Sequence, residues 1–310
     1  PDMTPSALAR DNAYLRTKLA RSEAYRRRLE DTKEQNAGLH RQIIQEIEAA
    51  RRKIADKEKE SDKALRLAGE VQKNLLPRRH LTIGGLEVAG KNLPSHAISG
   101  DYFDYLQHDP ACSTCLSVVV GDISGHGVDA ALLMTSARGF LRTRVAQPGS
   151  AAEIVTDMNR YLAEDVLDSG RFMTLFFLSI DPQARRVQWV RAGHDPALVY
   201  LPSQDRFEAL KGDGLALGVE RSETYAANVF EGLEDGQIIV IATDGIFEAC
   251  NRRGNMFGHR RLQDTIRQHR REPARRILEH VFEAVVGHVE GLPPEDDRTL
   301  VVIKKSPIAT

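Results

Sequence analysis

The stretch from Ser6 to Ala68 limits the possible folds most, because it contains no proline and a single glycine, Gly38. Arg, Lys, Glu, Asp and Ala dominate it, which is the composition of a long helix. Apolar residues recur with a 3.5-residue spacing, at twelve of the twenty core positions that this spacing defines between Leu8 and Leu75. Because this 3.5-residue spacing continues from Leu8 to Leu75, it predicts a coiled coil rather than a helix buried in a compact domain.

The predicted coiled-coil seam is uneven along its length. Arg26, Lys33 and Asn36 occupy core positions within residues 22–40, so we expect only marginal stability there. We interpret residues 1–67 as a helical coiled-coil linker and dimerisation region, with a parallel homodimer as the expected state. A solvated single helix, or an antiparallel hairpin packed on the globular part, is the alternative.

Residues 68–310 are predicted to form one α+β domain after Pro77 ends the helix. Branched and aromatic runs predict strands at residues 116–120, 174–180, 187–190, 197–201, 237–242 and 300–303. Helical periodicity predicts helices at residues 128–145, 151–167, 259–269 and 273–288. Several strands follow one another without a helix between them, which favours antiparallel pairing over a doubly wound parallel sheet.

Composition and charge limit the binding partners and the cellular location that we expect for the chain. The chain has 310 residues, 43 basic and 44 acidic side chains, and a net charge of −1, so bulk electrostatics favour neither nucleic acid nor an anionic membrane. Its apolar runs are too short to span a bilayer, and no secretory signal opens it. We expect a cytoplasmic fragment that begins at Pro1-Asp2-Met3 and lacks an upstream sensor or receiver domain, itself membrane-attached or free.

The three cysteines, Cys112, Cys115 and Cys250, are too few for a disulfide framework. The Cys112-x-x-Cys115 pair has the spacing of a redox motif or of half a zinc site. No second Cys or His pair stands at ligand spacing, so we expect reduced thiols.

Asp122 and Asp244 follow predicted strands, the pair Asp296-Asp297 precedes another, and Asp101 lies before the first predicted strand. Glycines, which allow close backbone approach, flank three of these acids at positions 100, 121 and 245. Four such acids at one sheet edge would raise one another's pKa, so the pattern predicts cations among them. All-oxygen ligation favours Mg²⁺ or Mn²⁺ over zinc. Taken singly, each acid has a structural explanation as a turn, a helix cap or a solvated loop residue. The acids are Asp101, Asp122, Asp244 and the pair Asp296-Asp297.

Seven segments carry a family resemblance. In order they are SGDYFDYL, GDISGHGVDAALLM, AGHDPALVY, LALGV, ATDGIFEACN, MFGHRRL and DDRTLVVIK. Together they resemble the metal-dependent PPM (protein phosphatase 2C type) serine/threonine phosphatases, and most closely the bacterial SpoIIE/RsbU-like branch. The resemblance covers about residues 68–304, including LAGEVQKNLLP, which is similar to the helix that leads into those domains.

The resemblance implies a β-sandwich flanked by helices, with two Mn²⁺ or Mg²⁺ ions at one end. Asp122 matches the acid that bridges both ions, and the carbonyl of Ile123 matches the backbone ligand beside it. Asp101 and Asp244 match two further metal acids. The last metal acid matches Asp296, the first member of its pair, with Asp297 left open as the alternative.

Two departures from the family pattern concern residues near these acids. Ser99 replaces the first glycine of the family's Gly-Gly-Asp, which leaves Asp101 intact. His126 is separated from Asp122 by three residues, unlike the order in eukaryotic members, so we assign His126 no catalytic role. The phosphate-binding arginine of eukaryotic relatives has no clear match.

The activity implied is that of a metal-dependent phosphoserine/phosphothreonine protein phosphatase. Resemblance to the branch implies a phosphorylated STAS-type anti-sigma-factor antagonist as substrate, within a partner-switching pathway. The alternatives are a catalytically weak signalling scaffold that binds such partners through the coiled coil, and a small-molecule phosphoester hydrolase of the same fold. The sequence contains neither a P-loop motif nor a Cys-x5-Arg motif, which argues against those two phosphate-handling mechanisms.

Overall fold

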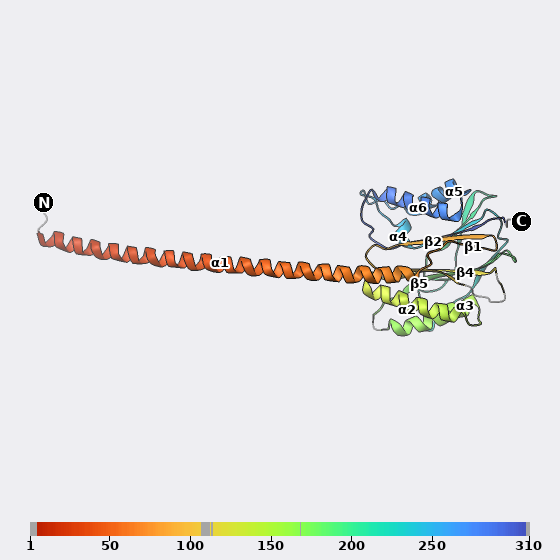
Figure 1. Ribbon diagram of the computed structural model, residues 1–310, viewed down its shortest axis with the longest axis horizontal. Coiled ribbons are helices and arrows are strands. Elements are labelled where there is room, and N and C mark those ends of the chain that lie inside the picture. Colours follow the sequence, from red (N-terminus) through yellow and green to blue (C-terminus); the bar gives the residue numbers. More distant parts are fainter. Residues whose placement is uncertain (1–4, 107–111, 113, 168, 308–310) are drawn as a thin grey trace. The chain divides into compact units, whose positions relative to one another are not determined.

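The computed structural model describes residues 5–106, 112, 114–167 and 169–307. The chain divides into two compact units, Pro1–Ala64 and Leu65–Thr310. One uninterrupted helix, α1 (Pro5–Leu75), forms the first unit, and its last turns, from Leu65, belong to the second (Figure 1). A continuous helix is incompatible with the antiparallel hairpin considered above.

The apolar residues of the predicted seam are exposed on α1. The large apolar side chains at seam positions from Leu15 to Val71 have 43–63% of their surface exposed, whereas Leu75, at the end of the helix, is half-buried. The exposed ones are Leu15, Leu19, Leu29, Ile43, Ile47, Ile54 and Val71. A helix normally buries such a stripe against another element. The exposed stripe supports the expectation of a coiled coil, and the dimer itself stays a prediction.

Replacing Ile43, Ile47 and Ile54 by Asp places three charges in the seam, so we expect the chain to change from dimer to monomer. The matched control carries Gln45→Asp, Ala49→Asp and Arg52→Asp, which add charge to the same turns away from the seam. Sedimentation equilibrium measures the mass of each variant. A monomeric parent chain, or a dimeric seam variant, would contradict the prediction.

Two antiparallel sheets form the centre of the second unit. The first has the order β1-β2-β11-β10-β7-β8, with β1 at Leu81–Ile83, β2 at Leu86–Leu93, β7 at Ala197–Leu201, β8 at Arg206–Leu210, β10 at Ile238–Ala242 and β11 at Arg298–Lys305. The second has the order β3-β4-β5-β6-β9, with β3 at Asp101–Leu106, β4 at Leu116–Ile123, β5 at Met173–Asp181, β6 at Arg186–Ala192 and β9 at Asn228–Glu231.

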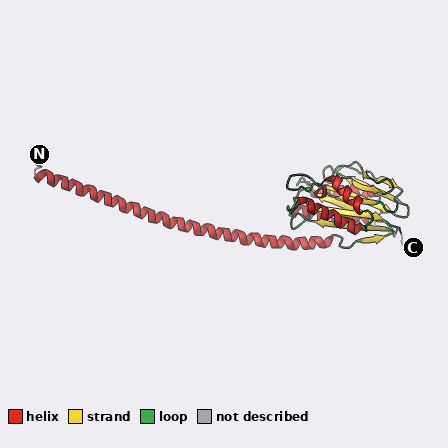
Figure 2. Cartoon of the chain, turned by 90° about the horizontal axis from the view of Figure 1, so that it is seen from above, coloured by secondary structure: helices red, strands yellow, loops and turns green. Residues whose placement is uncertain are grey.

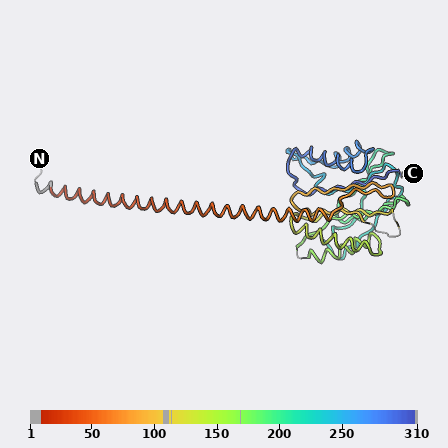
Figure 3. The backbone as a smooth tube through the Cα atoms, in the orientation of Figure 1, coloured from red at the N-terminus to blue at the C-terminus, as the bar shows by residue number. Residues whose placement is uncertain are grey.

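Helices cover the outer faces of both sheets. Figure 1 shows α2 (Val128–Val145) and α3 (Ala151–Asp165) along one side of the domain, and α4 (Asp244–Phe247), α5 (Gly258–His269) and α6 (Ala274–Val289) along the other. Figure 2 separates the strands from the covering helices by colour, and Figure 3 traces the same path through the backbone. The β-sandwich flanked by helices, and the α+β class, are confirmed.

The central strands are apolar because both of their faces are covered. Val118, Val119 and Val120 on β4 are fully buried, one face packing toward the other sheet and one toward the helices. A separate cluster of apolar side chains joins α5 and α6 to the first sheet. Such two-sided burial produces the continuous apolar runs that made these strands predictable.

All six predicted strands and all four predicted helices are present, with ends shifted by up to three residues. Five strands escaped prediction: β1, β2, β3, β8 and β9. One expectation is corrected here, because Asp101 does not precede the first strand. It is the first residue of β3, and two strands come before it in the chain.

The cysteines require a second correction. Cys112 and Cys115 are joined in a disulfide bond, and only Cys250 is a free thiol. The expectation of reduced thiols is therefore wrong for the Cys112-x-x-Cys115 pair. Among the described residues, no helix combines the length and the hydropathy needed to cross a membrane.

Candidate metal centre

The register of the second sheet brings two of the acids together. Asp101 on β3 lies directly opposite Asp122 on β4, and Asp122 lies opposite Thr174 on β5. Directly opposed residues of antiparallel strands project from the same face. Asp101 and Asp122 are therefore neighbours at one end of this sheet.

The first sheet delivers the other acids at the same end of the sandwich. Asp244 begins α4 just after β10, and Asp296 stands two residues before β11. Strands β10 and β11 are paired neighbours, with Ala242 opposite Leu300. Two hydroxyls join the sheets, because Thr243 and Thr299 donate hydrogen bonds of 2.9 and 2.6 Å to Oδ2 of Asp101.

The acids interact strongly with one another. Burial raises the pKa of Asp101 well above its usual value, and the charge of Asp122 raises it further. Burial, followed by the charges of Asp244 and Asp296, raises the pKa of Asp122 to about 8. Burial and then the charge of Asp296 raise the pKa of Asp244. Four of the predicted site residues are thus gathered in one electrostatic cluster that favours positive charge.

Asp297 has a different environment from Asp296. Its carboxylate accepts four hydrogen bonds of 2.7–2.9 Å, from the amide and hydroxyl of Ser95, the hydroxyl of Ser99 and the amide of Gly100. Both of its oxygens therefore hold the loop that leads into Asp101. Asp296 accepts one hydrogen bond, from the Asp297 amide, and acts on Asp122 and Asp244 through its charge.

Two of the flanking glycines are required by close backbone contacts. A Cβ atom at Gly245 would lie 2.1 Å from the carbonyl oxygen of Asp297. A Cβ atom at Gly100 would lie 3.2 Å from the carbonyl oxygen of Ile123, the predicted backbone ligand. The absence of side chains at both positions lets three acid-bearing segments meet.

Several groups around the acids were not predicted from the sequence. Thr243 and Thr299 hold Asp101, and Ser99 links Asp297 to the end of α1. The Gln72 side chain makes two hydrogen bonds to the Ser99 backbone, of 2.8 and 2.9 Å. The threonines stand inside the motifs ATDG and DDRT, so motif position was the one signal that pointed to them.

His126 is exposed and stacks on His96, with ring centroids 5.3 Å apart.

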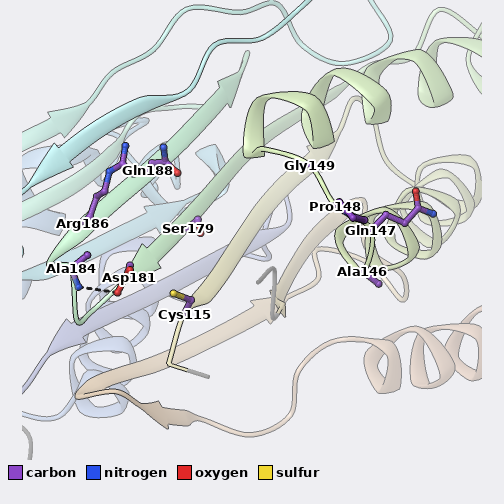
Figure 4. A pocket seen from close by; sticks show the side chains of 10 residues that line it. All are labelled: Cys115, Ala146, Gln147, Pro148, Gly149, Ser179, Asp181, Ala184, Arg186 and Gln188. Atoms are coloured by element: carbon purple, nitrogen blue, oxygen red, sulfur yellow. Dashed lines mark hydrogen bonds between the residues drawn. The ribbon is translucent and has the colours of Figure 1, made fainter. Parts of the chain in front are cut away.

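A cavity of about 190 Å³ reaches the acidic cluster, since Asp296, Gly245 and Arg298 line it. Arg298 is only 5% exposed, and its Nε has no hydrogen-bond partner. The larger cavity, of about 570 Å³, is lined by Cys115, Asp181 and others and includes none of the metal-site acids (Figure 4).

The arrangement of two sandwiched antiparallel sheets between helix layers is the fold of PP2C-type phosphatase domains. The SiaA PP2C domain of Pseudomonas aeruginosa superimposes with a TM-score of 0.69 at 23% identity, covering 80% of this chain and 98% of that domain. RsbX in complex with magnesium gives a TM-score of 0.55 at 17% identity, covering 74% of this chain and 99% of RsbX. These likenesses establish the fold.

The family follows from the sequence match. Residues 113–306 match the family model of Stage II sporulation protein E (SpoIIE), and the chain belongs to this family. The phosphoserine phosphatase RsbU of Bacillus subtilis is 23% identical over 241 residues, which are 78% of this chain and 70% of RsbU. Protein IcfG of Synechocystis sp. is 25% identical over 264 residues, which are 76% of this chain and only 40% of IcfG.

The raised pKa values predict how pH affects the metal-free chain. A carboxyl whose pKa is higher in the folded than in the unfolded state binds its proton more tightly when folded, so stability falls as pH rises from about 4 to about 8. Asp122→Asn removes one of the charges. We expect the variant to be more stable than the parent at pH 8, by on the order of 2 kcal/mol, and equally stable at pH 4.

Chemical denaturation in the presence of a chelator measures this difference. A variant that is less stable than the parent at pH 8 would show that the acids do not repel one another in the metal-free fold.

Substitutions of the two acids of the DDRT motif are predicted to have different effects. Asp297→Ala leaves four donors without their acceptor, so we expect a loss of folding stability on the order of 3 kcal/mol. Asp296→Ala should not lower the stability of the metal-free fold, because it removes a repelling charge, and it should weaken Mn²⁺ binding. Metal-free unfolding and Mn²⁺ titration of both variants check the assignment, which fails if Asp297→Ala unfolds like the parent.

Proposed function

We propose that this chain is a divalent-metal-dependent protein serine/threonine phosphatase. The observation that carries the proposal is the acidic cluster, in which Asp101, Asp122, Asp244 and Asp296 meet at one end of a PP2C fold. Membership of the SpoIIE family and the similarity to RsbU and RsbP, both named phosphoserine phosphatases, support it.

The donor atoms fit two hard cations. All candidate ligands are oxygens: the carboxylates of Asp101, Asp122, Asp244 and Asp296 and the carbonyl of Ile123. In a two-metal centre, these ligands would be shared between two ions roughly 3.5–4 Å apart. Mn²⁺ and Mg²⁺ are the proposed ions.

The chemistry needs no protein nucleophile. Divalent ions in this cluster would activate a water near neutral pH and neutralise the charge of the phosphoryl group. Asp122 lies opposite Asp101 and interacts with the charges of Asp244 and Asp296, which supports it as the ligand shared by both ions. Thr243 and Thr299 fix the Asp101 carboxylate, and Asp297 fixes the loop before it. In this assignment Asp297 positions the site and is not a ligand.

The proposed substrate is a phosphoserine or phosphothreonine on a STAS-type anti-sigma-factor antagonist, acting in partner switching. This part of the proposal rests on the resemblance to the RsbU-like branch. A scaffold without activity would not need to keep four mutually repelling acids, so the cluster favours the enzyme. The alternative, a small-molecule phosphoester hydrolase, is distinguished from a protein phosphatase by whether a small phosphoester or a phosphoprotein is hydrolysed efficiently.

We also propose that the helix regulates the site. The end of α1 contacts both elements that flank the acids, because Gln72 is bonded to Ser99 and Arg138 of α2 donates to the Leu75 carbonyl at 3.0 Å. A shift of these turns would move the loop that bears Asp101. This mechanism requires the charged seam variant at Ile43, Ile47 and Ile54 to change turnover on a phosphoprotein while the domain stays folded.

Chelation is expected to abolish dephosphorylation, and Mn²⁺ or Mg²⁺ to restore it. Asp122→Asn should lower the rate by roughly a thousandfold or more, because it removes the bridging charge. Asp264→Asn, an exposed acid on α5, is the matched control with unchanged activity. Mass spectrometry of host phosphoproteins after treatment with each chain identifies the substrate, and near-parental turnover by Asp122→Asn would contradict the proposal.

A further inference from the structure

A second reactive group lies at the end of the second sheet that is opposite the acids. The disulfide of Cys112 and Cys115 stands directly before β4, whose other end carries Asp122. The strand from Leu116 to Asp122 corresponds to roughly 20 Å. The acidic cluster therefore does not explain this disulfide, and an inference about it does not depend on the proposed phosphatase activity.

The disulfide adds little to the stability of the domain. It joins residues only three positions apart in the sequence. A disulfide stabilises a fold mainly by restricting the unfolded chain, and that effect grows with the number of residues in the closed loop. The same turn is also closed by a hydrogen bond of 3.3 Å that the Cys115 amide donates to the Cys112 carbonyl. A structural cross-link is thus a poor explanation of this pair.

The Cys115 side chain can be reached by a small molecule. Both cysteines are half-buried, and Cys115 lines the cavity of about 570 Å³ described above. Among the described residues, Cys112 is not part of that lining. The volume lies in the range of small-molecule sites, and accessible disulfides are the ones that exchange readily with thiols.

The cavity has polar and charged walls (Figure 4). Arg186 of β6 lines it; its Nε lies 3.1 Å from Glu231, so further N–H donors of the guanidinium remain for a ligand. Asp181 follows Ile180, the partner of Leu116, and its carboxylate lies within 4.8 Å of both sulfurs. These walls fit a hydrophilic thiol that carries a carboxylate for Arg186 and an ammonium group for Asp181.

The two sulfurs differ in their surroundings. Sγ of Cys112 lies 3.7 Å from Oγ1 of Thr114, and a disulfide sulfur has no proton, so the Thr114 hydroxyl is the donor. A hydrogen bond becomes stronger when its acceptor becomes an anion. Attack on Cys115 from the cavity therefore makes Cys112 the leaving thiolate, stabilised by this hydroxyl.

We propose that Cys112 and Cys115 form a thiol–disulfide exchange site for a low-molecular-weight thiol that binds in the cavity. The thiolate of the small molecule attacks Sγ of Cys115 and forms a mixed disulfide. The bond between the two cysteines breaks, and its electron pair goes to Sγ of Cys112, which then takes a proton from solvent. A second small thiolate attacks the small-molecule sulfur of the mixed disulfide and releases the Cys115 thiolate, which is protonated in turn. Two small thiols are oxidised to one disulfide, and the protein disulfide is reduced to two thiols.

The turn is held in place independently of the sulfurs, so the exchange is reversible. The hydrogen bond between the two cysteine backbones uses no sulfur atom. Thr114 also lies close to neighbouring turns, because a Cβ atom at Gly84 would lie 3.0 Å from Cβ of Thr114 and 2.7 Å from Cγ of Pro182. The two thiols therefore stay neighbours after reduction and can be joined again by a small-molecule disulfide.

The test measures the rate of reduction in the full chain with Cys250→Ser, so that only Cys112 and Cys115 contribute thiols. The probes are glutathione, a tripeptide thiol with carboxylates and an ammonium group, and 2-mercaptoethanol, a neutral thiol. We expect the glutathione rate to saturate with concentration, and Arg186→Glu to lower it roughly tenfold while changing the 2-mercaptoethanol rate little. Arg206→Glu, at an exposed arginine of β8 outside the cavity, is the matched control and should change neither rate.

Single-cysteine chains identify the sulfur that is attacked. In the Cys250→Ser background, Cys112→Ser leaves Cys115 alone and Cys115→Ser leaves Cys112 alone. Oxidised glutathione should form a mixed disulfide faster with Cys115, which the mass of the intact chain reports. Both substitutions open the same bond, so a folding defect would affect both chains alike, and thermal unfolding measures it.

Three results would overturn the proposal. A glutathione rate that rises linearly with concentration and does not respond to Arg186→Glu would show that no thiol binds in the cavity. Faster reaction at Cys112 would contradict the assignment of the attacked sulfur. Resistance of the folded chain to both thiols, with reduction only after unfolding, would make the disulfide a structural cross-link. Metal binding and phosphatase activity enter none of these measurements.

Discussion

Repulsion among buried carboxylates at one end of the sandwich is the constraint on which the rest of the domain depends. Asp101 and Asp122 lie on neighbouring strands of one sheet, and Asp244 reaches them from the other, so closing the sandwich raises the pKa of all three. Two threonine hydroxyls from the first sheet offset part of that cost at Asp101. In the proposed metal centre, cations would offset the remainder, so metal binding and closure of the two sheets would stabilise each other.

Asp296 and Asp297, the adjacent acids of the DDRT motif, have different roles. With four donors around it, this carboxylate fixes the loop at Ser99 and Gly100, while Asp296 remains available to the cluster. Ser99 is also where Gln72 of α1 is bonded. In the proposed regulation, a displacement at the end of α1 would reach Asp101 through the Ser99 backbone, and the Ser99 hydroxyl adds a bond to Asp297 that a glycine could not make.

Much of the fold was predictable because burial on both faces leaves a local signal. Strands β4, β5 and β10 are largely continuous apolar runs, whereas β8 and β9 are half-exposed edge strands, and two acids interrupt the aromatic residues of β3. The acids were predictable from motifs. The roles of Thr243 and Thr299 were not, because their bonds to Asp101 span 142 and 198 residues, and the Cys112–Cys115 disulfide was missed because spacing does not specify oxidation state.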